Sequence, residues 1–66
     1  MHIISLTIKQ AGRTIGNTSI REQAVVAAKA RARQTQIPVA VVANCDNGKQ
    51  IEVVFYPDGA SERIRE

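Results

Sequence analysis

The sequence is poor in the residues that small folds use to hold themselves together. Its 66 residues include one cysteine and one histidine, so neither an internal disulfide nor a Cys/His zinc site can form. A chain of this length usually needs such a link, self-association or very tight packing to be stable. We therefore predict a single domain over residues 1–66 that forms a homodimer.

Aromatic side chains are also scarce. Phe55 and Tyr56 are the only two, and tryptophan is absent. The core must then be built from Ile, Val, Leu and Ala, which makes it thin. A hydrophobic fraction of 44% is nevertheless normal for a globular protein, so the chain is expected to fold.

Long apolar runs are missing as well. No stretch approaches the roughly 18 apolar residues of a membrane span. The first residues lack the basic leader and the apolar segment of a secretory signal. We therefore expect a cytoplasmic protein that does not associate with membranes.

The pattern of the first half of the chain predicts two strands and a helix. Residues 2–9 alternate with the period of a half-buried strand, and residues 13–15 predict a short return strand that Gly16 ends. Residues 20–34 are rich in good helix formers, and Ser19 and Glu22 have the spacing of a capping box. The apolar face of this helix is expected to hold Ala24, Val25, Ala28 and Ala32.

The second half predicts a hairpin. Residues 37–43 form a continuous apolar run, typical of a strand covered on both faces. Asn47-Gly48 favours a tight turn into a returning strand over 50–56, and the charged residues 60–66 predict a frayed tail. The whole chain predicts an α+β fold of the order β-(β)-α-β-β, a small antiparallel sheet with one helix packed on one face.

No group of side chains has the composition and spacing of a catalytic site. His2 is the only histidine and lies at the chain end, where it is poorly held. Cys45 has the acidic neighbour Asp46, whereas reactive thiols lie in electropositive surroundings. The four glycines are isolated and form no phosphate-binding loop. We expect a non-enzymatic protein with no metal and no cofactor.

Two sets of residues are candidates for contact with a partner. The chain carries nine Lys and Arg against six Asp and Glu, and the basic helix residues are candidates for binding a macromolecular partner or nucleic acid. Lys29 and Arg33 share a helix face, whereas Arg31 lies nearly opposite. The second set is apolar and is expected on the sheet face away from the helix, as a dimer or partner face. It comprises Ile3, Val54 and Tyr56.

The outline of the chain combines a first strand, a capped Ala-rich helix, an Asn-Gly hairpin and a strand ending in Tyr-x-Asp-Gly. It resembles the very small phage-encoded inhibitors of bacterial CRISPR defence, the anti-CRISPR proteins, and short uncharacterised bacterial α/β domains. The residues that carry the resemblance are Ser19, Ala24, Ala28, Val41, Asn47, Gly48, Tyr56, Asp58 and Gly59.

The resemblance implies a protein that docks on a larger nucleoprotein machine and blocks it. These inhibitors share no functional motif, so it assigns no site residue. The leading hypothesis is a non-enzymatic docking module that binds a protein or nucleoprotein partner. The resemblance extends this hypothesis to an inhibitor from a phage or mobile element that acts on a nucleic-acid machine of its host. The alternative is direct nucleic-acid binding through the basic helix residues.

Overall fold

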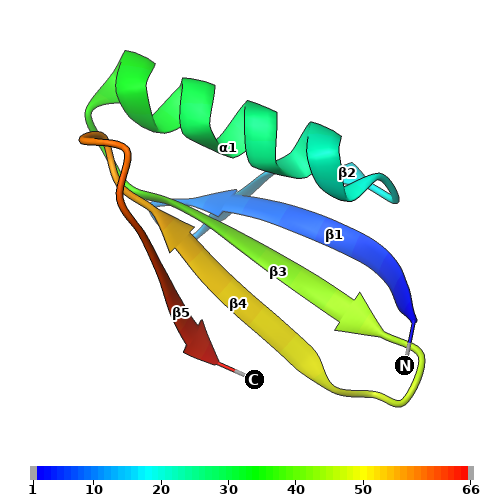
Figure 1. Ribbon diagram of the computed structural model, residues 1–66. Coiled ribbons are helices and arrows are strands. Elements are labelled where there is room, and N and C mark those ends of the chain that lie inside the picture. The colour runs from blue at the N-terminus through cyan, green and yellow to red at the C-terminus, as the bar shows by residue number, and fades with distance from the viewer. Residues whose placement is uncertain (1, 66) are drawn as a thin grey trace.

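One antiparallel sheet carries a helix across one of its faces (Figure 1). The computed structural model describes residues 2–65. The elements are β1 (Ile3–Gln10), β2 (Arg13–Thr18), α1 (Arg21–Thr35), β3 (Val39–Cys45), β4 (Gln50–Phe55) and β5 (Ser61–Arg65). The five strands lie in the order β2-β1-β3-β4-β5, and every neighbouring pair is antiparallel. The predicted α+β fold with a helix on one face is confirmed.

The helix packs on the sheet through its alanines. Ala24, Ala28 and Ala32 are fully buried, as their spacing predicts. They face a core built from aliphatic side chains of β1, β3 and β4 together with Phe55. Because alanine is small, the backbone of α1 lies close to the strands. The helix is 15 residues long, and no helix within residues 2–65 has the length and hydrophobicity to cross a membrane.

The predicted capping box does not form. α1 begins after Ile20, which has no side-chain capping hydrogen bond. Thr18 makes the side-chain hydrogen bonds at the start of the helix instead. Its hydroxyl accepts a 3.1 Å hydrogen bond from the Ile20 N–H and donates a 3.2 Å hydrogen bond to Gln23 Oε1. Thr18 can make these bonds because β2 continues to Thr18, which places this last strand residue next to the first turn of α1.

β2 is longer than predicted, because Gly16 does not end it. Gly16 lies opposite Ile8 in the β1–β2 pairing. A Cβ at this glycine would lie 3.6 Å from Ile8 Cδ1, an ordinary contact distance. The register shift in this pair lies between Ile8 and Lys9 on the opposite strand. A glycine is therefore tolerated here as a strand residue beside a bulky neighbour.

β3 is the central strand, flanked by β1 and β4. Its residues Val39, Val41 and Ala43 are buried on the helix side. On the other side Val42 is 8% exposed because its neighbours in register, Thr7 and Glu52, lie against it. The apolar run of β3 thus reflects its central position in the sheet, and the covering of its far face by a second chain stays a prediction.

Two hairpins follow β3. The Asn47-Gly48 turn is confirmed, with Gly48 at φ 84° and a 2.9 Å hydrogen bond from the Cys45 N–H to the Lys49 carbonyl. The prediction of a frayed tail is wrong for residues 61–65, because these residues form β5 along the edge of β4. Its charges are typical of an edge strand, which they protect from further pairing. Glu66, the last residue of that predicted tail, lies outside the described residues.

Candidate functional site

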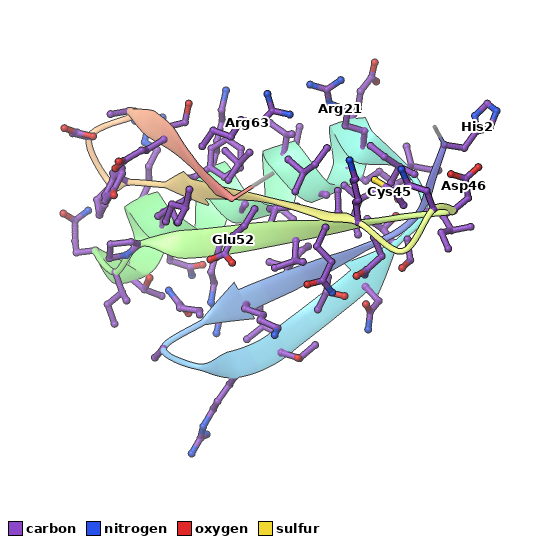
Figure 2. All side chains as sticks on the ribbon, turned by 90° about the horizontal axis from the view of Figure 1, so that it is seen from below. His2, Arg21, Cys45, Asp46, Glu52 and Arg63 are labelled. Atoms are coloured by element: carbon purple, nitrogen blue, oxygen red, sulfur yellow. The ribbon has the colours of Figure 1, made fainter. Side chains whose placement is uncertain are left out.

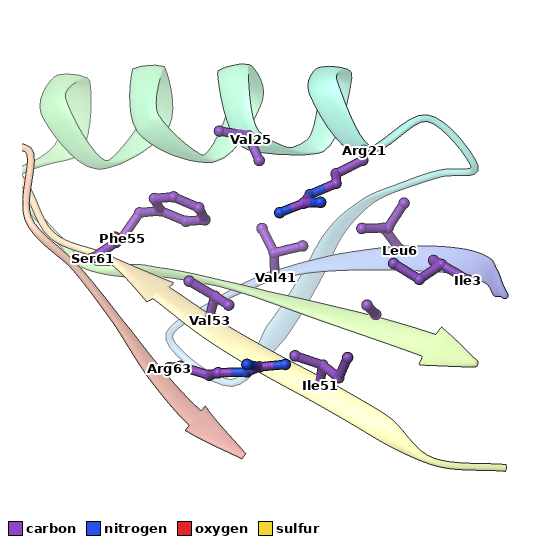
Figure 3. A pocket seen from close by; sticks show the side chains of 11 residues that line it. Ile3, Leu6, Arg21, Val25, Val41, Ile51, Val53, Phe55, Ser61 and Arg63 are labelled. Carbon is purple, nitrogen blue, oxygen red and sulfur yellow. The ribbon is translucent and has the colours of Figure 1, made fainter. Parts of the chain in front are cut away.

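The helix leaves part of its own side of the sheet uncovered. α1 packs over β1, β2, β3 and β4, and within residues 2–65 it makes no close contact with β5. Beside it, a groove of about 480 Å³ opens on the helix side of the sheet (Figure 3). We call it the helix-side groove. It is lined by Ile3, Leu6, Arg21, Val25, Val41, Ala43, Ile51, Val53, Phe55, Ser61 and Arg63.

The floor and one wall of this groove are apolar. Ile51 and Val53 on β4 form the floor beside β3, and Val25 of α1 stands above them (Figure 3). All three side chains pack against the core but remain only partly buried. The groove therefore presents a contiguous apolar surface that belongs to the core on one side and faces solvent on the other.

Two arginines give the groove its charge. Arg21, the first residue of α1, reaches down from the helix, and Arg63 of β5 lies beside Ile51 (Figure 3). Both arginines appear along the same edge of the molecule when it is viewed from below (Figure 2). No carboxylate is among the described residues that line the groove. Arg21 therefore brings a positive charge to the helix side of the groove.

Ile3 lies in this groove and not on the opposite face of the sheet. The pairing of β1 with β3 shifts register between Ile3 and Ser5, which leaves Ile4 63% exposed. A bulge of this kind adds a residue and reverses the alternation before it. The expectation that Ile3 joins Val54 and Tyr56 is therefore corrected.

Val54 lies on the sheet face away from the helix, between one apolar and one charged neighbour. It is opposite Ala40 on β3 and Glu62 on β5. The Tyr56 hydroxyl donates a 3.0 Å hydrogen bond to Glu62 Oε2. The apolar surface here is therefore interrupted by charge, and the dimer or partner contact expected at Val54 and Tyr56 stays a prediction.

The three helix residues predicted to contact a partner divide into two groups. Lys29 and Arg33 are exposed, four residues apart on the helix. Arg31 Nε donates a 3.2 Å hydrogen bond to Gln10 Oε1. Gln10 in turn donates to Thr35 Oγ1 at 2.7 Å, so Arg31 belongs to a network that ties the end of α1 to β1. The structure therefore leaves Lys29 and Arg33 together, apart from Arg31.

The residues weighed for catalysis lie at one end of the sheet (Figure 2). Cys45 is buried, with 3% exposure. The backbone N–H of His2 donates to Asp46 Oδ1 at 3.2 Å, and the Asp46 N–H donates to the His2 carbonyl at 2.8 Å. Asp46 therefore closes the end of the β1–β3 pair. Across residues 2–65, no three His, Cys, Asp or Glu side chains gather as a metal site.

Sequence reasoning did not single out Arg21, Arg63 or the groove itself. One signal in the sequence could have indicated the groove. The helix face consists of small alanines, which are too small to cover the apolar side of Ile51, Val53 and Phe55. No family model, curated protein or solved structure matches this chain.

Proposed function

We propose that this chain is a non-enzymatic docking module whose helix-side groove binds a macromolecular partner, a protein or a nucleoprotein. The observation that carries the proposal is the contiguous, partly exposed apolar surface of Val25, Ile51 and Val53. In small proteins such surfaces mark interaction sites, because burying them against a partner is favourable. The described lining has no His, Cys, Asp or Glu that acts as a general base, which supports binding over catalysis.

The resemblance to small phage-encoded inhibitors supports a partner that belongs to a nucleic-acid machine of the host. A docking module of this kind acts by occupying a surface of a larger machine that handles nucleic acid in the host. The proposal accordingly places the protein in the cytoplasm, where such machines work. It assigns no catalytic step, metal or cofactor to this chain.

A homodimer is compatible with this function. The predicted dimer contact uses Val54 and Tyr56, which are on the other side of the sheet from the groove. A dimer formed there leaves both grooves open. Each copy then docks independently, and the pair gains avidity if the partner repeats its binding site.

Capture from a lysate of the producing cells or their host tests the proposal. Tagged wild-type chain is compared with Val25→Ser and Val26→Ser at about 0.15 M salt, where weak charge contacts are screened. The two valines are adjacent on α1, but Val25 lines the groove whereas Val26 is 67% exposed outside it. The two changes alter helix propensity equally.

We expect one partner to be retained by the wild type and by Val26→Ser and to be lost with Val25→Ser. Circular dichroism checks that all three chains are folded. Nuclease treatment of the lysate separates a protein partner from nucleic acid that is captured on its own. Equal retention by all three chains, or no retention by any, contradicts docking through the groove.

A further inference from the structure

The space beside α1 has the width of one more helix. Five strands at a spacing of about 4.8 Å make a sheet roughly 19 Å across. A helix with its side chains is about 10 Å wide. α1 lies mainly over β3 and β1, reaches β2 and β4 at its borders and, within the described residues, makes no close contact with β5. A second helix packed alongside it, one helix width further along the sheet, therefore lies over β4 and β5.

An added strand does not fill this space. β5 is an edge strand, and a strand paired with it lies beyond it in the plane of the sheet. The floor at Ile51 and Val53 is above β4, one strand further in. Pairing at the edge therefore leaves the apolar floor exposed, whereas a helix lying on the sheet covers it.

The charge of the groove selects the chemistry of that helix. Arg21 and Arg63 line it from opposite sides, and no carboxylate is among its described lining residues. A second copy of this chain bound groove to groove would bring these arginines against each other, because a twofold interface pairs a patch with itself. Carboxylates on the partner complement Arg21, and apolar side chains cover the floor beside it.

We infer that the helix-side groove binds an acidic amphipathic helix of the partner, with apolar residues at i, i+3, i+4 and i+7 and glutamates or aspartates along its flanks. This inference rests on the proposed docking function and specifies the chemistry of its partner. The apolar stripe lies on Val25, Ile51 and Val53, and an acidic flank meets Arg21.

Three labelled synthetic peptides of about 15 residues, a length at which helices become stable, test the inference. The acidic probe has leucines at the helical spacing and glutamates on its flanks. The basic probe has lysine in place of each glutamate, and the strand probe has the acidic composition with leucines at alternate positions. Binding is measured by fluorescence anisotropy at about 0.15 M salt.

We expect the acidic probe to bind at least about tenfold more tightly than either of the other two. Methyl resonances of Val25, Ile51 and Val53 should shift on binding. Arg21→Glu should weaken the acidic probe by about tenfold or more, since a like charge then faces it. Lys29→Glu makes the same charge change on an exposed part of α1 and should alter binding by less than about threefold.

Arg21→Glu is compatible with folding, because an acidic residue in the first turn of a helix is favourable. The inference is overturned if the acidic probe fails to bind, if it binds no better than the basic or strand probe, or if Arg21→Glu leaves its affinity unchanged. If the probes fail while Val25→Ser still abolishes capture, docking through the groove stands and only the acidic helix is wrong. If capture is insensitive to Val25→Ser, the proposed function itself fails.

Discussion

The hydroxyl of Tyr56 donates a 3.0 Å hydrogen bond to Glu62 Oε2 and so joins the end of β4 to β5. Between them, the Tyr56 N–H donates to the Ala60 carbonyl at 2.9 Å and the Gly59 N–H donates to the Tyr56 carbonyl at 3.0 Å. The side-chain contact therefore closes a turn that the backbone already forms. The pKa of Tyr56 is raised above 10.0. The largest cause is this hydrogen bond to Glu62, which favours the protonated phenol, and burial and the negative charges of Glu62 and Asp58 raise the pKa further.

Replacing Glu62 by glutamine should lower the pKa of Tyr56 towards 10.0. Because the folded pKa is raised, the contribution of this contact to stability is present below pH 10.0 and is lost as the pH rises through the folded pKa. Tyr56 is the only tyrosine, so ultraviolet absorbance of tyrosinate reports it without ambiguity. The same titration of Glu52→Gln is the control. An unchanged pKa in Glu62→Gln would show that the contact is absent in solution.

Enlarging the central alanine of the helix should destabilise the fold. Ala28 is fully buried between α1 and the sheet, so Ala28→Leu should lower the free energy of unfolding by about 1–3 kcal/mol through overpacking. Ala30→Leu is the matched change at an exposed position and should stay within about 0.5 kcal/mol. Urea denaturation measures both. Equal effects of the two changes would mean that the alanine face does not set the distance between helix and sheet.

Sedimentation at micromolar concentration should show the predicted dimer, and Val54→Lys should shift it towards monomer. Val54 lies opposite Glu62, so a lysine there has an acidic neighbour and the hairpin should remain folded. Val26→Lys, on the exposed side of α1, is the control. A wild-type chain that sediments as a monomer would refute the dimer contact at Val54 and Tyr56.

Direct nucleic-acid binding makes a prediction that separates it from docking in the groove. If Lys29 and Arg33 contact phosphates, log affinity should fall linearly with log salt, and reversing both to glutamate should reduce the slope by about two. Lys49→Glu, in the exposed β3–β4 turn, should leave the slope largely unchanged. Mobility-shift assays on DNA and RNA at low salt measure this, and the absence of any shift removes this alternative.

The sequence predicts those features of the fold that depend only on residues close together in the chain. Ala24, Ala28 and Ala32 mark the buried helix face, and Asn47-Gly48 marks the hairpin, because helix spacing and turn conformation are local properties. Ile3 was misplaced because a bulge shifts the register of β1 against β3. Such a bulge depends on pairing between distant residues, and alternation within β1 alone gives no sign of it.

The groove escaped prediction for a related reason. Residues 60–66 are charged and follow a turn, so they predict a tail, whereas residues 61–65 pair with β4 as an edge strand. The floor of the groove lies on β4, and β5 adds Ser61 and Arg63 as its outer wall, opposite Arg21 of α1. The groove is thus a property of the completed sheet.

The position of β1 between β2 and β3 also has a consequence for how the chain reaches this fold. The β1–β2 hairpin and the β3–β4–β5 meander each form from segments that are neighbours in sequence. Within the sheet of residues 2–65, only the pairing of β1 with β3, as at Ile8 and Val41, joins strands of the two halves, and α1 connects the halves along the chain. Closing that long loop costs chain entropy before any contact between the halves compensates it. The slow step of folding should therefore be the docking of two preformed hairpin units along the β1–β3 seam, with α1 as the tether that sets their local concentration.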